Sequence, residues 1–246
     1  ERRPDASVAT PASPTPVQRD KSRETRERRE AMAGMAASVT GAPGRASPSM
    51  TAVTASIDEI RAIVDDSSAD VVVANHNSHR QVVLSGPTEA IEQVEAELAE
   101  AGLAAKRLPV ATAFHSSVVS GASDAFGRYL DEVMFSSPTV PVHSNETASP
   151  YTGDDTTMRA QLARQLSNSV RFVEMVESMY DQGARTFVEV GPSSVLTGLV
   201  GNILDGREHR MIPLDKKGRA GLSAFHHGIA QLVAAGVDVD LRRDMW

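Results

Sequence analysis

The chain has 246 residues, of which 41% are hydrophobic, so it is long enough to build a sizeable buried core. A formal net charge of −7 argues against general nucleic-acid binding, and the lack of cysteine excludes disulfides, thiol nucleophiles and cysteine metal sites. No apolar run approaches the length of a membrane span, and no secretory signal is recognisable near the N-terminus. We therefore expect a cytoplasmic protein that contacts neither nucleic acid nor membrane.

The N-terminal region is polar and rich in proline. Because it begins with Glu1 rather than methionine, we expect the chain to be an excised or incomplete segment. Prolines 4, 11, 14 and 16 stand among alanine, serine and threonine, and such a composition cannot bury enough surface to offset its ordering entropy. We predict a disordered or linker segment over 1–25, then a charged, solvent-exposed helix and a loop over 26–48.

The next stretch, 49–112, carries alternating strand and helix patterns. Ser56 and Glu59 form the pattern of a capping box, and Thr88 is expected to cap a second helix that ends at Gly102. The expected elements are strands over 50–54, 71–74, 81–84 and 108–110, with helices after Ser56 and Thr88. Apolar stripes at Ile57, Ile60 and Val64, and at Ile91, Val94 and Leu98, support the two helices. The order β-α-β-β-α-β predicts a ferredoxin-like unit.

Beyond residue 113 the pattern is that of an α/β fold. Helices are predicted over 121–133, 156–167, 170–181, 193–204 and 221–235, and strands over 140–143, 186–190 and 211–214. The helix over 193–204 has a wide apolar stripe, expected to face the core, which consists of Val195, Leu196, Leu199, Val200, Ile203 and Leu204.

His115 lies where the small unit is expected to join the larger part. A histidine at the end of a strand between two subdomains is well placed for acid–base chemistry, because clefts form at such junctions. The alternative is a structural histidine whose ring simply meets a backbone carbonyl group.

Several segments around His115 resemble one known family, the malonyl-CoA:acyl carrier protein transacylases, which includes the acyltransferase domains of polyketide synthases. The matching segments are Asn75–Ser78, Gln81–Gly86, Ala113–Ser116, Pro141–Asn145, Arg164–Leu166, Val170–Phe172, Glu189–Pro192 and Val195–Thr197. The resemblance runs from about residue 26 to about residue 235, in the family's order. The segments Ala74–Asn77 and Leu108–Val110 are most similar to iterative synthases of the enediyne and polyunsaturated fatty acid type.

The resemblance implies a mechanism and a set of site residues. A serine takes the malonyl-type unit from coenzyme A as an ester and passes it to the phosphopantetheine thiol of an acyl carrier protein. His115 corresponds to the base that deprotonates this serine, and Gln165 to the residue whose backbone carbonyl orients the histidine ring. Arg28 corresponds to the arginine that binds the free carboxylate of the extender unit, and Asn77 lines the same pocket. Phe114 corresponds to the aromatic residue that goes with malonyl selection, although ordinary core packing remains an alternative for it.

One part of the family pattern is absent from the chain. The family's nucleophile lies in a Gly-His-Ser-x-Gly turn, and no Gly-x-Ser-x-Gly occurs here. Arg29 also stands where the family has glycine. Ser116 and Ser117 adjoin His115, but neither has the pattern of a nucleophile elbow. We therefore expect the C-terminal part of the domain only, without transacylase activity of its own. It would consist of a ferredoxin-like small subdomain over 49–112 and the C-terminal part of an α/β-hydrolase-like large subdomain over 113–246.

The remaining expectations concern ligands and partners. We expect no bound cofactor or metal, because the pairs His76 with His79 and His226 with His227 lack further ligands at a recognisable spacing. By resemblance, Glu189 is structural and holds the turn before Pro192. The implied partners are malonyl-CoA, an acyl carrier protein and adjacent synthase domains. The alternative function is a non-catalytic remnant that binds a carrier or another partner. Exposed apolar surface is expected if the chain stands alone.

Overall fold

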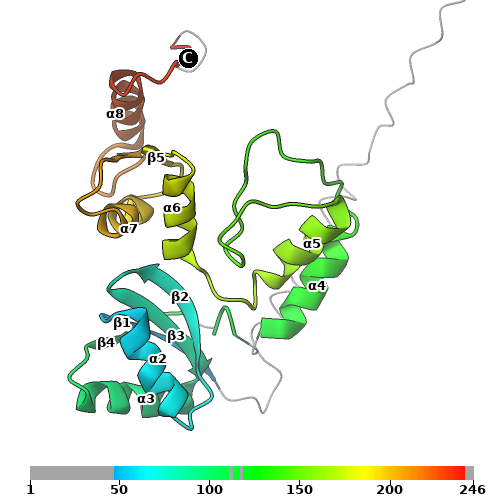
Figure 1. The fold of residues 1–246 in the computed structure, drawn as a ribbon, viewed down its shortest axis with the longest axis vertical. Helices are drawn as coiled ribbons and strands as arrows, with labels where there is room; N and C mark the ends of the chain where they lie inside the picture. The colour runs from blue at the N-terminus through cyan, green and yellow to red at the C-terminus, as the bar shows by residue number, and fades with distance from the viewer. Residues whose placement is uncertain (1–46, 111–112, 117–118, 242–246) are drawn as a thin grey trace, which may run out of the picture.

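The structure is a computed structural model that describes residues 47–110, 113–116 and 119–241. These ranges contain both helices and strands (Figure 1), so the predicted mixed α/β class is confirmed. The linker predicted over 1–25 and almost all of the helix and loop predicted over 26–48 lie outside the described residues.

The first part of the described chain is a β-α-β-β-α-β unit. Its elements are β1 (Pro48–Val53), α2 (Ile57–Asp66), β2 (Val72–Ser78), β3 (Gln81–Pro87), α3 (Thr88–Glu100) and β4 (Ala105–Arg107). The last strand was predicted over 108–110 and lies three residues earlier. The strands form an antiparallel sheet in the order β2-β3-β1-β4. The predicted capping box between Ser56 and Glu59 is present at the start of α2. Thr88 does not cap α3 as predicted, because its hydroxyl donates instead to the carbonyl oxygen of Ser47 at 2.6 Å.

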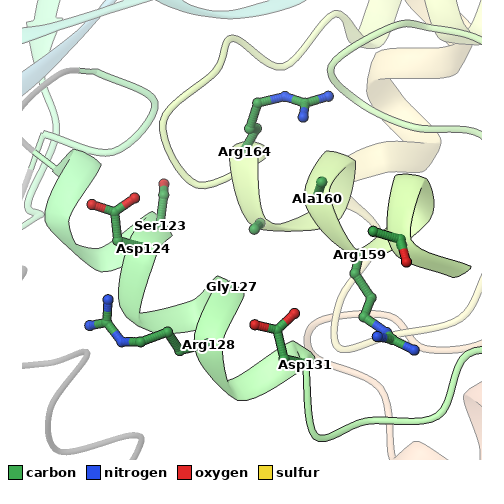
Figure 2. Close-up of a pocket in the computed structure, with 10 residues that line it drawn as sticks. Ser123, Asp124, Gly127, Arg128, Asp131, Arg159, Ala160 and Arg164 are labelled. Atoms are coloured by element: carbon green, nitrogen blue, oxygen red, sulfur yellow. The ribbon is translucent and has the colours of Figure 1, made fainter.

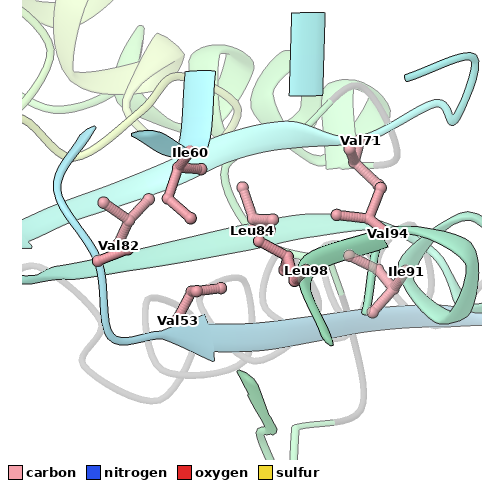
Figure 3. Close-up of a cluster of buried hydrophobic side chains, with 9 residues drawn as sticks. Val53, Ile60, Val71, Val82, Leu84, Ile91, Val94 and Leu98 are labelled. Carbon is pink, nitrogen blue, oxygen red and sulfur yellow. The ribbon is translucent and has the colours of Figure 1, made fainter. Parts of the chain in front are cut away.

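Both helices of this unit pack on the same face of its sheet (Figure 1), and their apolar side chains meet those of the strands there (Figure 3). The buried residues of this core are Val53, Ala55, Ile60, Val71, Val82, Leu84, Ile91, Val94 and Leu98. The predicted stripe of α3 is confirmed, since all three of its apolar residues are fully buried. Full burial of one such side chain contributes about 1.5–3 kcal/mol, so the cluster gives the unit a core of its own.

The second part is built mainly of helices. Its elements are α4 (Ser120–Leu130), α5 (Asp155–Arg164), α6 (Phe172–Asp181), β5 (Thr186–Glu189), α7 (Val195–Ile203), β6 (Arg210–Pro213) and α8 (Gly221–Ala234). Each lies close to the range predicted for it. The strand predicted over 140–143 is wrong: the segment is irregular, with an isolated bridge between His143 and Pro150. Pro141 has no N–H to donate to a ladder, which disfavours it inside a strand.

Strands β5 and β6 pair in parallel, and helices α6 and α7 pack beside them. The buried residues of this second core are Val173, Val176, Val200, Ile203 and Leu204. The predicted core-facing stripe of α7 is therefore correct at its C-terminal end only. Val195 and Leu196 are 64% and 46% exposed, because no described element covers the first turn of α7.

A short segment after α5 connects the two parts. The N–H of Val170 donates to the carbonyl oxygen of Ala74 at 2.8 Å, and the N–H of His76 donates to the carbonyl oxygen of Val170 at 3.0 Å. This bridge adds the segment as a short parallel partner to the edge strand β2. The end of α5 is thereby tied to the small sheet. Within the described ranges, no helix is both long enough and apolar enough to cross a membrane.

Candidate functional site

His115 lies in a turn that precedes α4, and its backbone φ of 59° is in the left-handed region. Such a φ is uncommon for a residue other than glycine and tends to persist where the surrounding structure holds a functional group in place. The N–H of His115 donates to the carbonyl oxygen of Leu166 at 3.0 Å. This bond fixes the turn against the segment that follows α5.

The ring of His115 is held by two backbone carbonyl groups. Its Nδ1 lies 3.0 Å from the carbonyl oxygen of Gln165 and 2.9 Å from that of Asn168. Because a carbonyl oxygen can only accept, Nδ1 carries a proton and shares it between the two oxygens. In the neutral ring Nε2 is then the nitrogen with a free lone pair, so it is the atom able to accept a proton.

The surroundings of the ring also set its charge. Burial lowers the pKa of His115 below its ordinary value, because the charged form loses water, while the hydrogen bonds to Asn168 and Gln165 act in the opposite direction. The loss of water has the larger effect. The ring is therefore mainly neutral near pH 7 and can act as a base.

Two carbonyl groups hold the ring, where the sequence predicted only that of Gln165. Gln165 is the residue at which α5 ends, and Asn168 follows three residues later. Carbonyl groups at the end of a helix lack partners within the helix, so they are available to an outside donor. The sequence carries no signal for Asn168, because its contribution is a backbone carbonyl group.

Phe114 lies beside the histidine and is 40% exposed, which does not fit the alternative of ordinary core packing. Its ring centroid is 6.4 Å from that of His115, with the two planes tilted by 47°. The two rings therefore lie next to each other.

The other two predicted pocket residues are not joined to His115 by the structure. The side-chain amide of Asn77, on β2, donates to the side-chain oxygen of Gln81 at 3.2 Å. No hydrogen bond to His115 is found for Asn77 in the described part of the chain. Arg28 lies outside the described residues. Both assignments therefore stay predictions.

The serine next to the histidine already has a partner. The hydroxyl of Ser116 is buried and donates to the carbonyl oxygen of Ala113 at 2.6 Å, within its own turn. A hydroxyl proton engaged in this way is poorly placed to be removed by a base. Ser117 lies outside the described residues.

The remaining histidine and glutamate candidates make structural contacts. His76 and His79, on and just after β2, lie 3.3 Å and 3.6 Å from Glu174 and Glu177 of α6. In the described ranges, no group of three or more histidine, aspartate or glutamate residues could hold a metal ion. Glu189 accepts hydrogen bonds from N–H groups in the first turn of α7, at 3.1 and 2.7 Å. It therefore caps the helix, rather than the turn before it.

A groove of about 450 Å³ runs between α4 and α5 (Figure 2). The charged residues that line it are Asp124, Arg128, Asp131, Arg159 and Arg164. Arg159 is paired with Asp155, and Arg164 with Glu146, so most of the positive charge is already balanced. His115 is not among the lining residues, and the groove is thus separate from the basic nitrogen.

The sequence was compared with known protein families. The model of the acyl transferase domain matches residues 22–239, which is most of the chain. The chain belongs to the acyl transferase domain family.

Relatives and solved structures agree with this membership. The acyltransferase chain is 33% identical over 193 residues to the polyketide synthase GfsA of Streptomyces halstedii, covering 78% of this chain and 3% of that protein. It is 41% identical over 134 residues to the malonyl CoA-acyl carrier protein transacylase of Escherichia coli (strain K12), covering 53% of this chain and 42% of that one. The resemblance found in the sequence is thereby confirmed.

Two solved acyltransferase domains illustrate the shared fold. The domain from the second module of the salinomycin polyketide synthase is 36% identical, with a TM-score of 0.72, over 80% of this chain and 46% of that chain. The domain of an iterative polyketide synthase in enediyne biosynthesis is 28% identical, also with a TM-score of 0.72, over 86% and 52%. The acyltransferase chain thus spans about half of each solved domain, and under half of the curated relatives named above.

Proposed function

We propose that this chain supplies the catalytic base of a transacylase that moves a malonyl-type unit from coenzyme A to an acyl carrier protein. The nucleophilic serine would lie outside the chain. The observation that carries the proposal is the His115 ring, whose Nδ1–H is held by two carbonyl oxygens while Nε2 is left as the base. The relative from Escherichia coli is a malonyl CoA-acyl carrier protein transacylase, which supports the choice of substrate and acceptor.

In the proposed reaction, Nε2 of His115 accepts the serine proton as the serine oxygen attacks the thioester carbonyl carbon. The carbon–sulfur bond then breaks, and the imidazolium returns the proton to the departing thiolate of coenzyme A. In the second half, Nε2 takes the proton of the phosphopantetheine thiol as its sulfur attacks the ester, and returns it to the serine. The two carbonyl dipoles at Nδ1 stabilise the imidazolium in both halves. Coenzyme A thioester and phosphopantetheine are thus substrate and acceptor, and the chain itself is proposed to bind no resident cofactor.

The selection of the acyl unit is assigned to three side chains. Arg28 would pair bidentately with the free carboxylate of the malonyl unit, and Asn77 would line the same pocket. Phe114 would occupy the space that a methyl group on C2 requires. Its exposure beside the His115 ring supports this role.

The same proposal includes a division of the chain into subdomains. Residues 49–112 would be the ferredoxin-like small subdomain, and residues 113–246 the C-terminal part of an α/β-hydrolase-like large subdomain, with His115 at their junction. The antiparallel strand order β2-β3-β1-β4 supports the first assignment. Residues 1–25 are proposed as a linker and 26–48 as a helix and loop of the large subdomain, beside adjacent domains of a synthase.

Transfer of labelled malonyl from malonyl-CoA to a holo-acyl carrier protein tests the function. The assay uses the polypeptide encoded by the whole open reading frame that contains this chain. His115→Ala should reduce the rate by roughly 10²–10⁴-fold, the usual contribution of a general base. His226→Ala, an exposed histidine of α8, is the matched control and should retain the rate. Transfer that is unaffected by His115→Ala would refute the role of the base.

The second candidate is a non-catalytic module that binds a carrier or another partner. The observation that favours it is the lack of any Gly-x-Ser-x-Gly in the chain. The coding sequence upstream of residue 1 separates the two candidates. A Gly-His-Ser-x-Gly shortly upstream supports the enzyme, and a coding sequence without one supports the binding module.

A further inference from the structure

Residues 142–151, called here the 142–151 loop, fold back on themselves beside the end of α5. The N–H of Tyr151 donates to the carbonyl oxygen of Val142 at 2.8 Å, and the N–H of Ser144 donates to that of Ser149 at 2.9 Å. The N–H of Ala148 closes a tighter turn on the carbonyl oxygen of Ser144, also at 2.9 Å. Backbone hydrogen bonds within the loop therefore fix its conformation.

The 142–151 loop holds both ends of the Gln165 side chain. The side-chain oxygen of Gln165 accepts from the N–H of Asn145 at 3.1 Å, and its amide nitrogen donates to the hydroxyl of Tyr151. Burial raises the pKa of Tyr151 above its ordinary value, so the phenol is neutral at physiological pH and its oxygen accepts this bond. Two contacts thus fix the residue whose carbonyl binds Nδ1 of His115.

The same loop holds Asn168, the second residue whose carbonyl binds the ring. The side-chain amide of Asn168 donates to a carboxylate oxygen of Glu146 at 2.8 Å. Arg164, at the end of α5, donates to the same oxygen at 2.9 Å. The Glu146 side chain is only 16% exposed, and hydrogen bonds to a carboxylate shielded from water are among the stronger ones.

We propose that the 142–151 loop positions His115 through two positioning residues, Glu146 acting on Asn168 and Tyr151 acting on Gln165. Each residue uses its side chain to bind the loop and its backbone carbonyl to bind Nδ1, so the loop sets the spacing between the two oxygens. The proposal deepens the function proposed above, and its catalytic meaning rests on that function. All the hydrogen bonds on which it depends are formed within this chain.

The proposed effect of the loop is to determine which ring nitrogen of His115 carries the proton. A histidine ring free in water takes mainly the tautomer with the proton on Nε2, in which Nε2 cannot act as a base. The two carbonyl oxygens impose the opposite tautomer because they accept only from Nδ1–H. Loosening either oxygen therefore moves the proton towards Nε2 and opens the ring to water. A contact with a purely structural role would change stability and leave the tautomer unchanged.

The test is ring-nitrogen NMR of the ¹⁵N-labelled full chain, with His115 assigned by comparison with His115→Asn. In Tyr151→Phe and in Glu146→Ala we expect the Nε2 signal to shift from the unprotonated position towards the protonated one. Glu146→Gln keeps an oxygen acceptor for Asn168 and should restore most of the native signal.

Glu95→Ala is the matched control, because Glu95 forms an ion pair with Arg107 at 2.7 Å in the small unit, away from the loop. It should reduce stability without moving the His115 signals. Should Glu146→Ala fail to fold, Tyr151→Phe decides the question. A native tautomer of His115 in folded Tyr151→Phe would overturn the proposal. The readout requires no acyl transfer, so a shifted tautomer in a protein without activity would refute the proposed function and leave the positioning role standing.

Discussion

His115 combines a strained backbone, a shared Nδ1 proton and partial burial in one residue. Burial removes water from the charged form and keeps the ring neutral, while the two carbonyl groups leave Nε2 as the base. The positive φ adds a cost of about 1–3 kcal/mol that the surrounding contacts must offset. At the scale of single residues, the chain thus loses some stability by holding His115 neutral, with its proton on Nδ1.

The burial of a neutral histidine makes stability depend on pH. The pKa of His115 is lower in the folded chain than the value of about 6.5 in the unfolded chain, so the unfolded state binds more protons as the pH falls. The contribution is fully present above the unfolded pKa and is lost as the pH falls through the folded pKa. The free energy of unfolding in urea should therefore drop less between about pH 7.5 and 5.5 in His115→Asn than in the native chain. Asparagine keeps an amide donor for the carbonyls and tolerates positive φ. The exposed His226→Asn should behave as the native chain, and an unchanged pH dependence in His115→Asn would contradict the account.

Phe114 offers a test of substrate choice. In the polypeptide from the whole reading frame, Phe114→Ser should open room for a methyl group on C2 and reduce the preference for malonyl over methylmalonyl by roughly 10–200-fold, the value of one methyl group in a fitted pocket. Competition between the two coenzyme A esters, read by mass spectrometry of the loaded carrier, measures the ratio. Phe126→Ser, on α4 and outside the motif, is the control. An unaltered ratio would leave Phe114 without this role.

The residues of the site were predictable to different degrees. His115 and Gln165 lie in short motifs whose residue types are themselves informative. Asn168 contributes a backbone carbonyl, whose availability depends on where α5 ends, and a residue type says little about that. Glu146 and Tyr151 reach the site only through the folding of a loop far from His115 in sequence.

At the scale of elements, Gly228 shows how closely helix α8 packs against the end of β6. A Cβ atom added at Gly228 would lie 2.6 Å from a side-chain carbon of Leu214 and 3.0 Å from the carbonyl oxygen of Pro213. Gly198, in the middle of α7, has open space around the same position. The two helices therefore use glycine for different reasons.

Substitution by alanine is expected to have opposite effects on stability at Gly228 and at Gly198. Gly228→Ala should lower the free energy of unfolding by about 1–3 kcal/mol, because overpacking against β6 outweighs the better helix propensity. Gly198→Ala should raise it by about 0.5–1 kcal/mol, since alanine loses less conformational freedom in a helix. Urea unfolding followed by circular dichroism measures both. Equal shifts in the two variants would mean that α8 does not pack on β6 as described.

Helices and strands were predictable where local pattern and tertiary contact agree. The stripe of α3 is buried as its spacing predicts, because a complete sheet face lies against it. The stripe of α7 is only half buried, because burial depends on what covers a helix and not on its periodicity. The failed strand at 140–143 shows the same limit, since its valines alternate but the segment pairs only through the isolated bridge between His143 and Pro150.

At the scale of the whole molecule, the segment from β5 into α7 exposes a row of apolar side chains. Val188, Val190, Val195 and Leu196 are all at least 40% exposed, beside a parallel sheet of two strands in the described part. Parallel sheets are normally covered on both faces. The exposed apolar surface expected from the sequence is therefore present, on a chain that spans about half of each solved domain described above.

In the function proposed above, this chain carries the base of an acyltransferase and not its nucleophile. Intact-protein mass spectrometry of the purified 246-residue chain after incubation with malonyl-CoA tests this most directly. We expect the mass to stay that of the unmodified chain, under conditions in which a complete malonyl transacylase accumulates its malonyl ester. A stable malonyl adduct that peptide mapping places on a serine of this chain would contradict it.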